Sequence, residues 1–139
     1  MINIDEFKKV DIILGQILSA EKIPNTDRLL KLSVDLGPVL VQEVKEEVSA
    51  LNDDDMQSIP ATDFIEAKHD IRQIVSGIAN YFPDISVLVG KKCMFIANLE
   101  PRMIRGFESQ GMIMALSTED GKFSLLIPNE DIPIGTRAK

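Results

Sequence analysis

The strongest constraint on this chain is a two-residue alternation of apolar and polar side chains between positions 30 and 36. The apolar positions are Leu30, Leu32, Val34 and Leu36, and the polar positions between them are Lys31, Ser33 and Asp35. Successive side chains of a strand point to opposite faces, so this period predicts a β-strand with one face in the core. A turn-forming cluster at 24–27 precedes the strand, and Gly37-Pro38 ends it.

Four further segments carry strand-like patterns, so the chain is predicted to be all-β. The five strands are predicted over residues 10–20, 30–36, 72–76, 91–98 and 109–117. Residues 77–89 are predicted to form a short helix and loop interrupted by Pro83, and Asp120-Gly121 indicates a hairpin turn. Gly15 lies inside the first strand, where it can permit the coil or bulge that a small closed barrel needs. Residues 128–139 form a C-terminal extension.

Length and composition predict a single domain with one core. The chain has 139 residues, of which 45% are apolar. No apolar run approaches the ~20 residues of a membrane span, and the first residues lack the pattern of a signal peptide. We therefore expect a cytoplasmic protein without membrane contact. Cys93 is the only cysteine and lies in an apolar strand, which predicts a buried and inert thiol.

The sequence offers no catalytic constellation, and we expect neither enzyme activity nor a cofactor. His69 is the only histidine, and it lies in a segment that carries nine of the 22 acidic residues. The spacing Glu66-x-x-His69 alone is a weak metal-site signal, and a solvated helix face is the favoured interpretation. A Gly-rich phosphate-binding motif is also missing.

A long acidic insertion, residues 38–71, separates the second and third predicted strands. It contains nine acidic and two basic residues, a net charge of 2 − 9 = −7, which equals the net charge of the whole chain. Helical spacing predicts an amphipathic helix through Val41, Val44, Val48 and Leu51. Thr62 or Asp63 can cap a second helix that extends through His69. We therefore expect a mostly helical acidic insertion, and the rest of the chain is electrically balanced.

The connection between the fourth and fifth predicted strands, residues 97–112, has the composition of a binding surface. Arg102 and Arg105 supply guanidinium groups suited to phosphate, and Gly106 and Gly111 permit close approach of another backbone. The alternative interpretation is an ordinary hairpin whose arginines are only solvated.

The motifs along the chain, taken together, resemble the stand-alone tRNA-binding domain family. They are Asp11-Ile12 with Gly15 and Ile17, Pro24-Asn25-Thr26-Asp27-Arg28-Leu29-Leu30-Lys31-Leu32, Arg72-Gln73-Ile74-Val75-Ser76-Gly77-Ile78-Ala79, Val89-Gly90-Lys91-Lys92, and the run 98–112. The resemblance implies a five-stranded OB (oligonucleotide/oligosaccharide-binding) barrel with a short helix between strands 3 and 4. It also implies recognition of tRNA, as a homodimer, with an aminoacyl-tRNA synthetase as a further partner.

The resemblance also implies which residues contact tRNA, wherever this sequence matches the family pattern. These residues are Asn25, Arg28, Asn98, Arg102, Arg105, Ser109 and Met112. Ser109 and Met112 belong to the Ser-x-Gly-Met motif associated with tRNA binding in the family. Burial in the core is an equally good interpretation of Met112, because it adjoins an apolar strand. Ile13 and Met103 depart from the family, since many members carry a basic residue at these two positions.

The sequence leaves two alternative functions open, and it also predicts a mode of assembly. A chaperone of the CsaA type would bind unfolded polypeptide with the same barrel. A protein-interaction module would instead dock a partner on the apolar face of the first helix in the insertion. The apolar C-terminal segment around Ile127, Ile132 and Ile134 is expected to form the two-fold interface of a homodimer.

Overall fold

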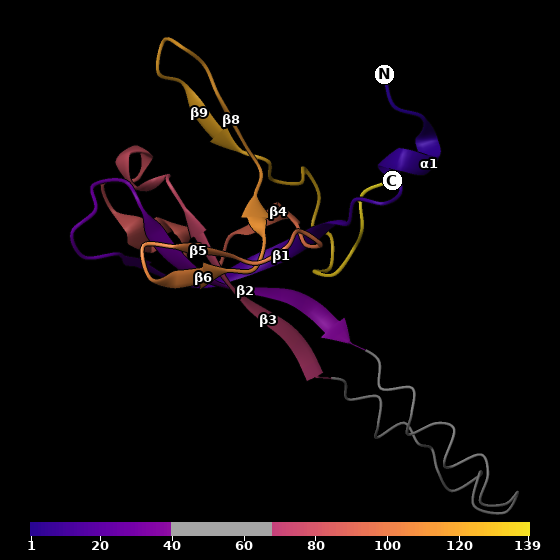
Figure 1. Ribbon diagram of the computed structural model, residues 1–139, viewed down its shortest axis with the longest axis horizontal. Coiled ribbons are helices and arrows are strands. Elements are labelled where there is room, and N and C mark those ends of the chain that lie inside the picture. The colour runs from indigo at the N-terminus through magenta and orange to yellow at the C-terminus, as the bar shows by residue number, and fades with distance from the viewer. Residues whose placement is uncertain (40–67) are drawn as a thin grey trace, which may run out of the picture. The chain divides into compact units, whose positions relative to one another are not determined.

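The computed structural model describes residues 1–39 and 68–139 (Figure 1). The predicted helix at 41–51 lies outside these residues. By packing, residues 1–37 and 71–139 form one compact unit, and residues 38–70 form another. In the described part of the chain, no helix is long and apolar enough to span a bilayer.

The described structure is almost entirely β, as the sequence predicted. Its strands are β1 (Ile12–Lys22), β2 (Leu30–Val39), β3 (Lys68–Ser76), β4 (Lys92–Ile96), β5 (Arg102–Ile104), β6 (Phe107–Ser109), β7 (Met112–Ile113), β8 (Ala115–Ser117) and β9 (Phe123–Leu125). Within residues 1–39 and 68–139, helical structure is limited to α1 (Ile4–Phe7) and to the 3₁₀ turns η2 (Ala79–Tyr81) and η3 (Ile85–Leu88). The helix expected between the third and fourth strands is therefore two short turns on either side of Pro83, which cannot continue a helix from the residues before it.

A five-stranded sheet in the order β3-β2-β1-β4-β7 builds the frame. Strand β1 belongs to two ladders, because its first half pairs with β4 and its second half with β2. The β1–β2 register shifts between Ile17 and Ser19, which marks a bulge at Leu18. The sequence had suggested a bulge at Gly15, but the structure places it further along the strand, at Leu18. A Cβ at Gly15 would lie 2.8 Å from Leu36 Cδ2, so this glycine is needed for packing.

The core lies inside the curl of this sheet. Its fully buried side chains come from the inward positions of β1 to β4 and from η3, namely Ile17, Leu30, Leu32, Val34, Ile74, Leu88, Cys93 and Phe95. The alternation at 30–36 therefore predicted the inward face of β2 correctly. Burial raises the pKa of the Cys93 thiol to about 11, so the thiolate is scarce at neutral pH and the thiol is inert, as expected.

One strand prediction and one helix prediction need correction. Residues 109–117 do not form one strand, because Ser109 belongs to β6 and the chain leaves β4 after β7. The hydrogen bonds of Met114 with Met94 and Leu126 mark the point where β8 turns away to pair with β9. The helix predicted to extend through His69 is wrong at its end, since Lys68 and His69 belong to β3; its earlier residues lie outside the described part of the chain. Pairing with β2 outweighs the local helix signal there.

The C-terminal extension pairs with the first half of β1. The Gly135 amide donates to Leu14 O at 2.8 Å, and the Leu14 amide donates to Thr136 O at 2.9 Å. An ion pair of 2.8 Å between Arg137 and Asp11 fixes the end of the extension. Gly37 has a φ of +98°, and a Cβ there would lie 2.8 Å from the Gly135 Cα, so β2 and the extension cross at two glycines.

Candidate functional site

The two arginines of the 97–112 connection are held on a short hairpin of their own. Strands β5 and β6 pair with Arg102 opposite Ser109 and Ile104 opposite Phe107. The turn between them is Arg105-Gly106, and both residues have positive φ values, 50° and 87°. Positive φ at both central residues defines a type I′ turn, whose twist suits a two-stranded ribbon. Arg105 is therefore the exposed tip of an ordered hairpin.

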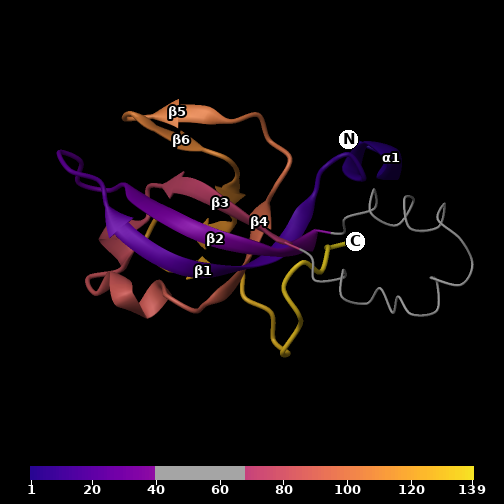
Figure 2. The same ribbon diagram turned by 90° about the horizontal axis from the view of Figure 1, so that it is seen from below.

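The hairpin lies over one face of the sheet. Strand alternation places Arg102, Ile104 and Phe107 on a common face of the hairpin. This face is turned to the sheet, because Lys31 Nζ of β2 lies 4.8 Å from the centre of the Phe107 ring. Figure 2 shows the hairpin on one side of β1, β2 and β3, and the segment with η2 and η3 on the other.

Hydrogen bonds fasten the base of the hairpin to β3. The Ser109 hydroxyl, in a residue only 6% exposed, accepts from the Val75 amide at 3.0 Å and donates to Gly111 O at 3.2 Å. The Gln110 amide donates to Gln73 O at 2.8 Å, and Gln110 Oε1 accepts from the Gln73 amide at 2.9 Å. Arg72 Nη1 donates to the carbonyls of Ala97 and Gln110. These bonds connect β3, at one edge of the sheet, to the segment between β4 and β7, at the other edge.

Asn98 also uses its side chain within the protein. Its Oδ1 accepts from the Asp11 amide at 2.8 Å, and its Nδ2 donates to Lys9 O. The side chain therefore holds the segment before β1 against the end of β4. Among the seven residues expected at the site, Asn98 and Ser109 are the two whose side-chain polar groups bond to the backbone of the described protein.

The turn between β1 and β2 projects at the same end of the molecule as the hairpin tip (Figures 1 and 2). Asn25 in this turn has a φ of 65°, a conformation that asparagine tolerates better than most residues. Arg28 is exposed, and its carbonyl accepts from the Ala79 amide at 3.0 Å, which ties the turn to η2. Asn25, Arg28 and Arg105 thus share one end of the molecule.

Met112 lies on β7 opposite Ile96, and it is 46% exposed. The alternative interpretation of Met112 as a core residue is therefore wrong. Arg102 and Arg105 are also exposed, in agreement with either a binding role or simple solvation.

A polar groove of about 280 Å³ lies on the sheet face next to the hairpin. Its lining comes from β1, β2, β3 and the base of the hairpin: Ser19, Lys31, Leu32, Ser33, Ile71, Arg72, Gln73 and Gln110. Lys31 also forms an ion pair of 3.2 Å with Glu21. The sequence placed Lys31 and Ser33 only as polar positions of the second strand, and Gln73 only within the third. The alternation of Lys31 and Ser33 was a signal for a shared face, and the structure adds that the β5–β6 hairpin borders it.

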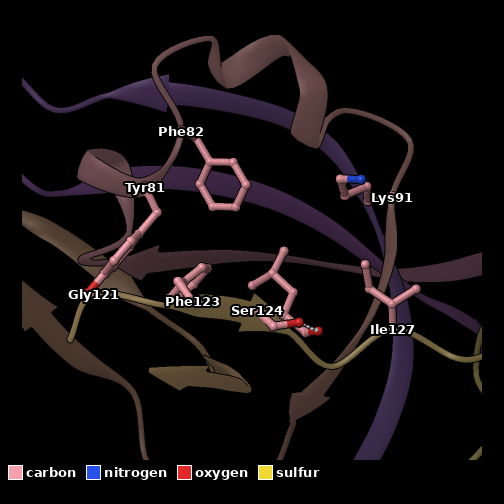
Figure 3. A pocket seen from close by; sticks show the side chains of 8 residues that line it. Tyr81, Phe82, Lys91, Gly121, Phe123, Ser124 and Ile127 are labelled. Atoms are coloured by element: carbon pink, nitrogen blue, oxygen red, sulfur yellow. Dashed lines mark hydrogen bonds between the residues drawn. The ribbon is translucent and has the colours of Figure 1, made fainter. Parts of the chain in front are cut away.

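A second hollow, of about 380 Å³, is lined by aromatic side chains (Figure 3). The Tyr81 and Phe123 rings stack with centroids 4.0 Å apart, and Phe82 meets Phe123 edge-on at 5.7 Å. Lys91 and Ile127 also line this hollow. It joins η2 to the β8–β9 hairpin and uses none of the residues expected at the site.

Comparison with protein families gives one match that covers more than half of the chain. Residues 63–137 match the family model described as "Putative tRNA binding domain". The match includes β3 to β9, and therefore the arginine hairpin.

The sequence relatives that match nearly the whole of this chain are methionine–tRNA ligases. The ligase of Methanosphaerula palustris is 39% identical over 136 residues, which make up 98% of this chain and 15% of that enzyme. The chain thus spans about one-seventh of the length of such curated relatives.

Solved structures of similar fold cover the whole chain. The crystal structure of a MetRS-related protein from Pyrococcus horikoshii has a TM-score of 0.71 and 33% identity, and it covers 100% of this chain and 98% of that one. The CsaA chaperone of Bacillus anthracis has a TM-score of 0.68 and 22% identity, and it covers 100% of this chain and 99% of that one. This second likeness concerns the fold alone.

Proposed function

The chain belongs to the tRNA-binding domain family, and from this membership we propose that it is a non-catalytic module that binds folded tRNA through the β5–β6 hairpin and the neighbouring β1–β2 turn. The relatives imply a synthetase as the setting in which this module acts. We propose that it presents tRNA to an aminoacyl-tRNA synthetase, either as a separate factor or as part of a larger chain.

The observation that carries the proposal is the conformation of Arg105. A residue other than glycine at positive φ costs about 1–2 kcal/mol, and asparagine or glycine would occupy this turn at lower cost. A guanidinium group at this tip is therefore better explained by a contact outside the protein than by turn formation. Arginine binds phosphate with two parallel hydrogen bonds, which suits the backbone of an RNA.

The seven expected residues divide into two roles. We assign contact with tRNA to the exposed side chains of Asn25, Arg28, Arg102, Arg105 and Met112. Asn98 and Ser109 instead position the binding elements, because their hydrogen bonds hold the β4 end and the base of the hairpin. The methionine supplies a polarisable apolar contact for a base or a ribose.

We further infer that the curled sheet is a five-stranded OB barrel, with β7 and β8 together as its fifth strand. The sharing of β1 between β2 and β4 supports this assignment, as do the bonds from Gln73 and Val75 to Gln110 and Ser109 at the open edge. In such barrels the exposed face of the second and third strands and the adjoining loops bind oligonucleotides. The hairpin and the polar groove lie on that face.

Filter binding of bulk tRNA at two salt concentrations tests the proposed function. We expect saturable binding that weakens steeply as salt rises, because phosphate contacts release counterions. A reduced, unfolded polypeptide tests the alternative of a CsaA-type chaperone, for which the aromatic hollow offers a site for apolar side chains. Binding of the polypeptide without binding of tRNA would overturn the proposal in favour of the chaperone.

We also propose that the module is a homodimer built on the β8–β9 hairpin and the adjoining apolar side chains. The hairpin forms a two-stranded sheet of its own. Leu125 of β9 is buried in the core, whereas all three residues of β8 are exposed. Leu116 is 63% exposed and Ile127 is 51% exposed, which leaves apolar area for a second copy to cover. Ile132 and Ile134, expected in the same interface, are half-buried in the extension that pairs with β1.

Light scattering at micromolar concentration should therefore report a dimer for the parent and a monomer for Leu116→Arg with Ile127→Arg, because charges would enter an apolar two-fold interface. Ile4→Arg is the matched control, since Ile4 is also exposed but lies on α1. A monomeric parent, or a double variant that stays dimeric, would contradict the proposed interface.

A further inference from the structure

The polar groove beside the hairpin has the construction of a site for a single flat ligand. Ile71, which is 49% exposed, gives it an apolar surface, and Ser19 and Ser33 face each other across β1 and β2. Binding sites for small or flat groups combine such apolar area with a few convergent polar groups. The groove is thus unlike a plain phosphate-binding surface.

The bulge at Leu18 brings Ser19 to this face. Leu18 and Ser19 are both exposed, although successive residues of a regular strand would point to opposite sides. Bulges commonly re-aim a side chain next to a functional site. After the shift, Ser19 stands opposite Ser33, and Glu21 stands opposite Lys31.

Several polar groups of the groove remain available to a ligand. In the part of the chain that the structure describes, the hydroxyls of Ser19 and Ser33 form no hydrogen bond to protein. The Gln110 backbone amide donates to Gln73, and its Oε1 accepts from Gln73. The side-chain Nε2 of Gln110 is therefore left as a donor for a ligand. Gln73 donates through Nε2 to Glu108 O at 2.9 Å and keeps Oε1 as an acceptor. Donors and acceptors together are what the edge of a nucleobase requires.

Cations border the groove on the hairpin side. Lys31 lines it, and Arg102 lies on the hairpin face that is turned to the sheet. A nucleotide whose base entered the groove would therefore have its phosphate near positive charge. Duplex RNA hides its base edges in a deep and narrow major groove, so only an unstacked base can offer its edge here.

We propose that this groove binds one unpaired, unstacked nucleobase of the RNA, with hydrogen bonds from Ser19, Ser33 and Gln110. The inference rests on the proposed function, and it adds recognition of a base to contacts that would otherwise be made with phosphates alone. The hairpin then contacts the phosphates of the RNA backbone, while the groove selects RNAs that expose an unpaired base next to those phosphates.

A pair of hairpin RNAs tests the inference: one is fully paired, and the other is identical except for one bulged nucleotide. Fluorescence anisotropy should show about 10-fold tighter binding of the bulged RNA by the parent, since the base gains hydrogen bonds from Ser19, Ser33 and Gln110. Ser19→Ala with Ser33→Ala should remove most of this preference and leave the salt dependence unchanged, because no phosphate contact is lost. Ser117→Ala, at an exposed serine of β8 that lines neither hollow, is the control and should retain the preference.

Other outcomes would separate this inference from the proposed function. If tRNA binds but the bulged and paired RNAs bind equally, or if the Ser19 and Ser33 variant keeps the preference, the groove is not a base site. If tRNA itself does not bind, the proposed function fails first. A mixture of nucleoside 5′-monophosphates should not compete at millimolar concentration, because a single nucleotide lacks the further phosphates that would bind the hairpin tip at Arg105; competition would assign the groove to free nucleotides and overturn the inference.

Discussion

Replacing Arg102 and Arg105 together by alanine is expected to weaken tRNA binding by about 10- to 100-fold at about 0.1 M salt. In the proposed site, each exposed guanidinium would contribute a charge-assisted contact to phosphate, and the double variant removes two such contacts. The plot of log affinity against log salt should lose about two units of slope. The fold should persist, because both side chains lie on the surface of the hairpin. Filter binding over a salt series measures both quantities.

Lys122→Ala with Lys139→Ala is the matched control for this experiment. It removes the same number of positive charges from exposed positions on the β8–β9 connection and the C-terminal extension. We expect a much smaller loss of affinity, since only the long-range field changes. Equal losses in the two double variants would mean that net charge, and not the hairpin, governs binding.

Gly37→Ala is expected to lower the free energy of unfolding by about 2–5 kcal/mol. A side chain at a φ of +98° costs about 1–2 kcal/mol. The new Cβ would also lie 2.8 Å from the Gly135 Cα and 3.1 Å from the Ile134 carbonyl oxygen, and overpacking of this kind costs about 1–3 kcal/mol more. Because the obstructing atoms are backbone, relief requires the extension to move away from β1. Thermal unfolding followed by circular dichroism should show a Tm lower by roughly 10 °C or more.

Gly121→Ala separates the two contributions. Gly121 has a similar φ of +96°, but a Cβ there meets nothing within 4 Å. This variant should lose only the conformational part, about 1–2 kcal/mol. If both variants unfold at the same temperature, the close contact between Gly37 and Gly135 does not contribute to the free energy of unfolding.

The regular strands were predictable because local pattern and tertiary structure agree there. The alternation from Leu30 to Leu36 predicted which face of β2 is buried, and Asp120-Gly121 predicted the turn between β8 and β9. The β5–β6 hairpin was less visible. Its strands have only three residues each, and Arg105-Gly106 lacks the Asn-Gly or Asp-Gly signature of a type I′ turn. His69 illustrates the opposite error, because a capping pattern suggested a helix where cross-strand pairing makes a strand.

The candidate site was only partly predictable, for a reason that concerns hydrogen-bond partners. Ser109 and Asn98 have the right chemistry to bind a ribose or a phosphate, but the sequence cannot tell whether the protein uses these groups itself. The structure shows both side chains bonded to backbone. Arg102 and Arg105 were proposed from their residue type, and the structure places both exposed on the β5–β6 hairpin. Lys31 and Phe107 were not, because their contact joins positions far apart in the chain.

The pairing of the C-terminal extension with β1 has a consequence for how the module can be attached to another protein. Asp11 and Arg137 hold the two ends of the chain at one corner, and Figure 2 shows both ends on the side away from the tip of the β5–β6 hairpin. A domain joined at either end would therefore lie on the side opposite the hairpin tip and would leave the hairpin uncovered. The same geometry would let the order of domains along a polypeptide be exchanged without rebuilding the surface proposed to bind RNA.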